Sequence, residues 1–260
     1  MFIRTMSALI GAPILLTLVY FGGSYTFFLV TLLTLLALRE FIQIGDKIGI
    51  RTWTKLSTLF ALIWLISLVN GGEKWMLPIL LFWLLIGFGR FALTYPGTTL
   101  NEANFNILSV FYTVVLLSHL YLLRQLPRGI EWTFLTIFLV WSTDTGAYLI
   151  GRQFGRNLLA PKVSPKKTIE GSLGGLLFSI GMAVGFWRLV GGAPIWTYIL
   201  LAIVIGTSAQ IGDLFESAIK RSAGVKDSGK LIPGHGGILD RFDSLIFALP
   251  LVYYGVILLT

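Results

Sequence analysis

The sequence has no cysteine and few charged residues. Only 12% of its 260 residues are charged while 55% are hydrophobic, whereas about a quarter of the residues of a typical soluble domain are charged. The absence of cysteine excludes disulfide bonds and thiolate metal sites. A water-soluble fold could not bury so much apolar surface, so the composition indicates an integral membrane protein.

Familiar nucleotide-binding and hydrolase signatures are also missing. The chain has no Walker-type lysine loop, no dinucleotide-binding glycine fingerprint and no convincing order of serine, histidine and aspartate. The aromatic residues, 14% of the chain, are typical of packing and of anchoring at the membrane interface. Any chemistry must therefore come from other polar residues.

Long hydrophobic runs repeat from one end of the chain to the other. A transmembrane helix needs about 20 predominantly apolar residues. Nine runs approach this length: 6–22, 24–40, 56–72, 75–93, 105–123, 132–150, 171–190, 195–213 and 238–259. The first two are joined only by Gly22, Gly23 and Ser24, so they could instead form a hairpin that enters and leaves on one side. The predicted fold is therefore all-α, a polytopic membrane protein with about nine transmembrane helices.

The lysines and arginines are distributed unevenly across these spans. With the N-terminus in the cytoplasm, 16 of the 20 fall on the cytoplasmic side, leaving Lys74, Arg124, Arg128 and Arg188 outside. Positive charge concentrates in cytoplasmic loops, so this split supports both the span count and the orientation. The net charge of +8 then reflects topology and affinity for anionic lipid headgroups. Because no soluble basic face is evident, we expect no nucleic-acid partner.

Residues 1–260 are expected to form a single membrane domain whose two halves differ in kind. Residues 1–140 hold five carboxylates, which we expect to be solvated charges in loops or at span ends: Glu40, Asp46, Glu73, Glu102 and Glu131. The other seven carboxylates lie within residues 141–260, among basic and glycine-rich loops. We therefore expect the catalytic residues in the second half.

Four charged residues of the second half are predicted to meet near the cytoplasmic face of the membrane. Asp144 lies inside an apolar span, where an ionised carboxylate needs a cation, a metal or water. Asp213 and Glu216 are three residues apart where another span ends, and Lys220 follows at helical spacing. If that helix continues past residue 213, these three side chains share one face.

Asp240 and Asp243 repeat the three-residue spacing at the start of the last span. Their side chains would share a helical face, with Arg241 turned about 100° away. Carboxylate oxygens suit magnesium, which typically binds one or two carboxylates together with substrate phosphates and water. Two carboxylate pairs and Asp144 at one membrane depth therefore favour a metal site.

The loop 161–171 carries lysines and hydroxyls on a proline-stiffened backbone just before a predicted helix. A helix N-terminus has free amide groups, so with nearby lysines it forms a ready phosphate site. The alternative is that these lysines only enforce topology. Arg152 and Arg156 could extend the basic surface, and His235 lies in a glycine-rich stretch whose amides could approach an anion closely.

The last loop and the start of the last span carry three groups of residues at fixed spacing within 217–243. They read Ser217-Ala218-Ile219-Lys220-Arg221, then Lys226-Asp227-Ser228-Gly229, then Ile232-Pro233-Gly234-His235-Gly236-Gly237-Ile238-Leu239-Asp240-Arg241-Phe242-Asp243. This stretch resembles the signature of the phosphatidate cytidylyltransferases, also called CDP-diacylglycerol synthases. A second region of that family is similar to Asp144–Tyr148, Gly151-Arg152 and Ser164–Thr168. One departure is Arg156-Asn157, where bacterial members often carry a His-Lys pair.

The resemblance implies that phosphatidate and CTP are converted to CDP-diacylglycerol and pyrophosphate. It implies a requirement for magnesium, and a second cation, monovalent or divalent, is compatible with it. We assign the metal to Asp144, Asp213, Asp240 and Asp243, and the catalytic cations to Lys167, Lys220, Arg221 and Arg241. Substrate binding is assigned to Ser164, Lys166, Thr168, Lys226, His235, Gly236 and Gly237. The expected location is a bacterial inner membrane with the site facing the cytoplasm, and the sequence is compatible with a homodimer.

Two other functions stay open at this point. A CTP-dependent lipid kinase acting on a prenol or similar alcohol would share the membrane setting and the nucleotide, but would release CDP instead of pyrophosphate. An ion or metabolite transporter could use Asp144 to line a path. The carboxylates and lysines cluster at one predicted membrane face, whereas a transporter needs access from both. This distribution favours an enzyme.

Overall fold

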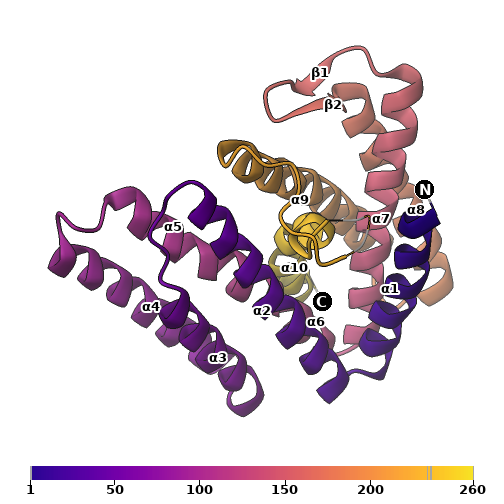
Figure 1. Cartoon of the computed structure of the whole chain (residues 1–260). Helices are drawn as coiled ribbons and strands as arrows, with labels where there is room; N and C mark the ends of the chain where they lie inside the picture. Colours follow the sequence, from indigo (N-terminus) through magenta and orange to yellow (C-terminus); the bar gives the residue numbers. More distant parts are fainter. Residues whose placement is uncertain (1, 233, 235, 260) are drawn as a thin grey trace.

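The structure is a computed structural model that describes residues 2–232, 234 and 236–259, and within them it is almost entirely helical (Figure 1). The helices are α1 (Phe2–Phe21), α2 (Gly23–Lys47), α3 (Thr54–Asn70), α4 (Glu73–Thr94), α5 (Leu100–Val110), α6 (Leu117–Gln125), α7 (Gly129–Phe154), α8 (Ile169–Val190), α9 (Ile195–Ser222) and α10 (Leu239–Leu259). A π-helical segment, η1 (Phe111–Leu116), joins α5 to α6 without a break.

Each predicted span corresponds to one helical rod in the described part of the chain. Because α5, η1 and α6 form one continuous helix over residues 100–125, the rods number nine. Seven of them are long and apolar enough to cross a bilayer, and the two shorter apolar stretches are Leu9–Phe21 in α1 and the whole of α3. The predicted all-α, polytopic architecture is therefore confirmed.

The first two helices form a tight hairpin. The chain reverses at Gly22 and Gly23, whose φ angles of 68° and 48° lie in the left-handed region that glycine adopts without strain. Arg124 closes this turn, since its guanidinium donates hydrogen bonds to the carbonyls of Val19 (2.8 Å) and Tyr20 (3.0 Å) at the end of α1. Arg124 thus links the hairpin to α6 in addition to carrying a loop charge.

A small antiparallel sheet, β1 (Leu158–Ala160) with β2 (Ser164–Thr168), stands where the sequence predicted a loop. In Figure 1 this hairpin projects beyond the end of α7. The strands are short and polar, so periodicity gave no signal for them. The hairpin leads directly into α8, whose N-cap is Thr168, with its hydroxyl accepting a hydrogen bond from the Gly171 amide at 3.1 Å.

The helices of the second half pack most closely on one another. Glycines allow this approach between α7 and α8: a Cβ added at Gly146 would collide with the Phe178 ring, and one at Gly174 would collide with the Ile150 side chain. Small residues at helix contacts are typical of membrane bundles. In contrast, α3 and α4 lie together at the edge of the molecule in Figure 1, away from α7 and α8.

Candidate active site

Two cavities share a wall at the end of the bundle formed by α7, α8, α9 and α10. The first has a volume of about 460 Å³ and the second about 490 Å³. Asp144 of α7 and Asp213 of α9 line both cavities. These two carboxylates therefore stand at the junction of the two cavities.

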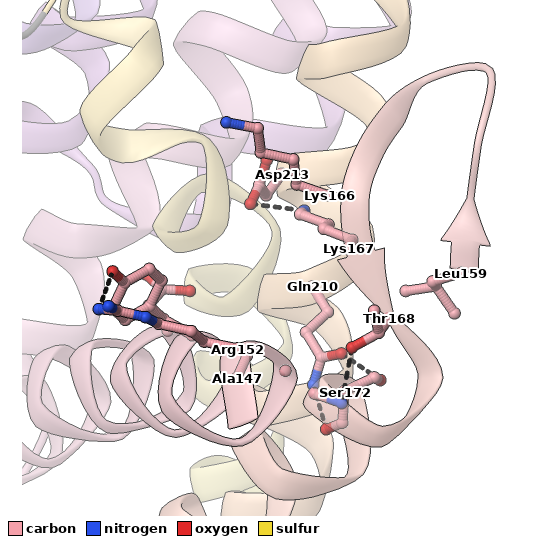
Figure 2. Close-up of a pocket in the computed structure, with 13 residues that line it drawn as sticks. Ala147, Arg152, Leu159, Lys166, Lys167, Thr168, Ser172, Gln210 and Asp213 are labelled. Atoms are coloured by element: carbon pink, nitrogen blue, oxygen red, sulfur yellow. Dashed lines mark hydrogen bonds and ion pairs between the residues drawn. The ribbon is translucent and has the colours of Figure 1, made fainter. Parts of the chain in front are cut away.

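The first cavity lies between α7, the β1–β2 hairpin, α8 and α9 (Figure 2). Lys166 and Lys167 of β2 line it together with Arg152 of α7. Lys167 reaches across to α9, where its Nζ lies 2.5 Å from Asp213 Oδ2. On another wall, Gln210 of α9 donates to the Ser172 carbonyl at 3.2 Å and accepts from the Ser172 hydroxyl, which fixes α9 against α8.

The second cavity lies between α7, α9, the loop that follows α9, and α10. Its polar lining consists of Asp144, Asp213, Lys220, Arg221, Lys226, Asp227, Asp240, Arg241, Asp243 and Ser244. The two loops that the sequence singled out also touch, because Arg221 Nε donates to the Val163 carbonyl at 3.4 Å. The structure thus brings both motif regions together around one space, as their resemblance to a single family implied.

Lys220 is surrounded by carboxylates. The helix α9 continues to Ser222, well past residue 213, so Asp213, Glu216 and Lys220 do lie on one helix as predicted. Lys220 pairs with Glu216 one turn earlier, and its Nζ lies 2.5 Å from Asp240 Oδ1 of α10. Lys220 and Glu216 are both buried, which makes this an internal ion-pair cluster that ties α9 to α10.

Asp240, predicted as a metal ligand, accepts several hydrogen bonds from the protein itself. Its Oδ2 accepts from the amides of Ser228 (2.9 Å) and Gly237 (2.7 Å), while Oδ1 faces Lys220. The Ser228 hydroxyl is also 2.9 Å from Oδ2. A carboxylate with this many donors has few lone pairs left for a cation. In this arrangement Asp240 anchors the loop before α10.

The remaining predicted metal ligands are better placed for a cation. Asp144 and Asp213 face both cavities, and Asp243 lines the second one. Within the described ranges, no three Asp, Glu or His side chains form a group that could hold a metal ion by themselves. The four predicted ligands are therefore not one cluster, but two carboxylates beside cavities with room for substrate phosphates fit the usual binding mode of magnesium.

The predicted phosphate-binding residues are distributed around the two cavities. Lys226 and Arg241 line the second one, and Arg221 also donates to the Val225 carbonyl at 3.0 Å. Thr168 contributes the N-cap of α8 to the first cavity. Ser164 begins β2 and does not line either described cavity.

The glycine-rich stretch before α10 is a tightly folded turn. Gly236 has a φ of 86°, and its carbonyl accepts a hydrogen bond from the Ile232 amide at 2.9 Å. Gly237 is buried, and its amide is directed at Asp240. Both glycines therefore shape the turn and do not line either cavity. His235, predicted to bind substrate, lies outside the described residues.

Two carboxylates outside the predicted site turn out to hold its loops in place. Glu170 accepts hydrogen bonds from the amides of Arg156 (3.0 Å) and Asn157 (3.2 Å) and from the Asn157 side chain (2.7 Å), which fixes the chain after α7. The prediction that Glu40 is a solvated charge is wrong. It is only 5% exposed and contacts residues almost 200 positions later in the chain, so no local pattern could reveal its role.

Comparisons with known proteins agree with this geometry. Residues 2–259 match the model of the cytidylyltransferase family. The chain is 37% identical to a phosphatidate cytidylyltransferase of Staphylococcus haemolyticus and 38% identical to one of Staphylococcus epidermidis, in each case over 96% of both chains. A phosphatidate cytidylyltransferase of Staphylococcus aureus is 35% identical over the same share. The chain belongs to the cytidylyltransferase family.

Proposed function

We propose that this protein transfers CMP from CTP to phosphatidate, giving CDP-diacylglycerol and pyrophosphate. The observation that carries the proposal is the pair of connected cavities that share Asp144 and Asp213 and are bordered by lysines and arginines from both motif regions. Such a site suits two anionic reactants that must be brought together. The names of the relatives along nearly the whole chain support the same reaction.

The reaction forms one P–O bond and breaks another. A phosphate oxygen of phosphatidate attacks the α-phosphorus of CTP, and the bond from that phosphorus to the bridging oxygen of pyrophosphate breaks. Because the attacking phosphate monoester is already largely ionised near neutral pH, no general base is needed. The protein then has to neutralise charge and align the two phosphates.

Lys167 is well placed for the first of these tasks. Its ammonium, at the junction beside Asp213, would exchange its carboxylate partner for a substrate phosphate. Lys166 and Arg152 border the same cavity, while Lys226 and Arg241 border the other. This division gives each cavity its own cations, as expected if one holds the nucleotide phosphates and the other holds the lipid phosphate.

An apolar groove supplies a place for the lipid tails. It has a volume of about 350 Å³ and is lined by Gly11, Ala12 and Leu15 of α1, by Trp141 of α7, and by Phe242 and Leu245 of α10. Arg241, Trp141 and Leu245 also line the second cavity. A lipid could thus keep its acyl chain in the groove while Arg241 binds its phosphate. The second cavity is therefore assigned to the lipid phosphate and the first to the nucleotide.

Magnesium fits the carboxylates at the junction of the cavities. Asp144 and Asp213 would hold the ion, with substrate phosphate oxygens completing its oxygen ligands. Bound there, magnesium would supply charge neutralisation and a fixed alignment of the phosphates. We restrict the proposal to one magnesium site, at the two carboxylates that the cavities share.

The site is assigned to the cytoplasmic face of a bacterial inner membrane. In the nine-span arrangement, 16 of the 20 lysines and arginines fall on the side of the two motif loops, and the positive-inside rule favours the cytoplasm for that side. CTP is a cytoplasmic nucleotide, so this orientation gives the site access to its soluble substrate. The lipid would reach it from within the membrane.

The decisive experiment identifies both products. Purified protein in detergent is incubated with labelled CTP, magnesium and phosphatidate, and the lipid and nucleotide fractions are analysed. We expect labelled CDP-diacylglycerol and pyrophosphate, and neither product when magnesium is chelated. CDP released in a parallel reaction, in which a prenol replaces phosphatidate as the acceptor, would instead show a lipid kinase. Absence of any nucleotide product with intact, folded protein would overturn the proposal.

A further inference from the structure

The carboxylate of Glu40, near the end of α2, accepts its described hydrogen bonds from the loop before α10 and from the first residue of α10. Its Oε1 accepts from the Ile238 amide at 2.9 Å, and its Oε2 accepts from the Leu239 amide at 3.0 Å. The Ser228 hydroxyl is 3.0 Å from the same Oε2. A carboxylate at the first amides of a helix satisfies donors that have no partner within the helix and interacts favourably with its dipole. A residue of the N-terminal half therefore caps α10.

Ser228 connects Glu40 to the ion-pair cluster of the site. Its hydroxyl lies between Glu40 Oε2 (3.0 Å) and Asp240 Oδ2 (2.9 Å). The single hydroxyl proton can be donated to only one of these oxygens at a time. The Ser228 amide donates to Asp240 in either case. Glu40, Ser228, Asp240 and Lys220 thus form one continuous polar network from α2 to α9.

Two glycines of the motif are packed directly against the Glu40 carboxylate. A Cβ added at Gly229 would lie 2.5 Å from Glu40 Oε1 and 2.9 Å from its Cδ, which is too close for any side chain. A Cβ at Gly237 would collide with Glu40 Oε2 and with the Ser228 hydroxyl. The loop therefore fits closely around the Glu40 carboxylate.

The position of Glu40 is itself fixed by packing. The next residue, Phe41, is buried and contacts the rings of Phe105 and Tyr112, with centroids 4.9 Å and 5.8 Å away. Tyr112, in the π-helical segment, also packs on Phe215 of α9 at 5.2 Å. Since close-packed side chains of this size move little, the carboxylate is presented to the loop from a rigid support.

We infer that Glu40 is a positioning residue for the transfer reaction, which holds the loop 226–239 and the start of α10 in the geometry that the second cavity requires. The inference rests on the proposed function. Lys226 and Arg241, on either side of the Glu40 contacts, both border that cavity. Glu40 does not line either cavity, so it acts through these residues and not on substrate.

Glu40→Gln is the test, because the amide keeps the shape of the side chain but has only one acceptor oxygen. In either orientation, its NH₂ group faces the amide of Ile238 or of Leu239, and two donors meet. We expect the kcat of the folded enzyme to fall on the order of 100-fold, as misplacement of site residues by about 1 Å can cause. Glu40→Asp keeps the charge on a shorter side chain and should restore part of this loss.

The matched control is Asp46→Asn, on the same helix. Asp46 is exposed and accepts a hydrogen bond from the Thr52 hydroxyl at 2.9 Å, away from the loop before α10. This variant loses the same charge and should keep the kcat of the unaltered protein. If Glu40 has a purely structural role, Glu40→Gln will lower yield or Tm but leave the kcat of the folded fraction unchanged, and the inference fails.

A second measurement does not depend on turnover. Hydrogen–deuterium exchange of the full chain in detergent should become faster in peptides covering residues 226–243 of Glu40→Gln, and stay unchanged in α8. Equal exchange in both proteins would overturn the positioning role. If the unaltered protein makes no CDP-diacylglycerol, the proposed function fails, yet the exchange result still decides whether Glu40 holds the loop.

The contact with Gly229 allows a sharper version. Gly229→Ala places a methyl group against the Glu40 carboxylate and should lower kcat. In a Glu40→Ala background the space is open, so the same change should have little further effect. Mutations in direct contact are non-additive in this way, whereas distant ones add. Fully additive losses would show that the two residues act separately and would contradict the inference.

Discussion

The two halves of the molecule contribute to the site in different ways, and not as their sequences alone indicated. Residues 141–260 supply every side chain except Val140 that borders the two cavities of the site, while α3 and α4 contribute an apolar hollow lined by Phe60, Trp83 and their neighbours. Yet α2, from the first half, provides the carboxylate that caps α10. The reactive groups thus come from one half of the chain, while their positions depend on the other half.

The strongest test of this division concerns the carboxylates at the junction of the cavities. Asp144→Asn and Asp213→Asn remove charge where magnesium is proposed to bind, and each should lower activity by roughly 10²- to 10³-fold, as loss of a principal electrostatic contact does. Accumulation in the membrane should be normal. Turnover is measured over a magnesium titration, and Asp227→Asn, exposed on the rim of the second cavity, should show a milder loss.

Lys167 offers the next largest effect. Lys167→Met keeps much of the length of the side chain but loses the ammonium that contacts Asp213, so activity should fall by about 10- to 100-fold. Lys162→Met is the matched control, because Lys162 is an exposed residue of the turn between β1 and β2. Equal, near-normal turnover in both variants would mean that these lysines serve topology alone.

Lys220 and Asp240 were assigned from the sequence as a catalytic residue and a metal ligand. In the structure they pair with each other, so their variants are interpreted differently. Removing the Lys220 ammonium would leave Glu216 and Asp240 buried without their cation, which is strongly destabilising for a buried ion pair. Asp240→Asn would turn an amide group toward the Ser228 and Gly237 donors or toward Lys220. A loss of activity in either variant would therefore report on folding of the loop as well as on chemistry.

The peripheral helices should behave in the opposite way. Trp83 of α4 is fully buried and packs against Phe60 of α3, with ring centroids 4.7 Å apart and the ring planes tilted by 40°. Trp83→Ala should lower stability, since truncation of a buried tryptophan costs about 3–5 kcal/mol. The kcat of the folded fraction should stay unchanged, as measured beside a thermal unfolding curve in detergent. A large loss of kcat would show that α3 and α4 belong to the catalytic unit.

The elements that the sequence predicted well are those with a strong local signal. Spans of about 20 apolar residues identified the nine helical rods, and helical spacing identified the shared face of Asp213, Glu216 and Lys220. The β1–β2 hairpin was missed because its polar strands lack a hydrophobic pattern. Glu40 was missed because its partners are 188 to 199 residues away in sequence. Spacing placed Asp240 beside Asp243 but could not show that the preceding loop folds back onto it.

The smallest expected effect is that of single cysteine substitutions, which should leave activity unaltered. They test the orientation of the chain in the membrane. The cysteine-free sequence allows single cysteines to report on sidedness, provided that the chosen position is accessible. Ser228, a natural choice from its place in the loop, is only 1% exposed and lies between two carboxylates, so it should label poorly from either side.

Lys162 and Lys230 are exposed in the two motif loops, and neither borders a cavity. In sealed vesicles of known sidedness, Lys162→Cys and Lys230→Cys should react with a membrane-impermeant thiol reagent only from the cytoplasmic side, because the positive-inside rule places both loops there. Labelling of either position from the opposite side would overturn the nine-span orientation, and labelling of the two from different sides would separate the loops that the structure joins through Arg221 and Val163.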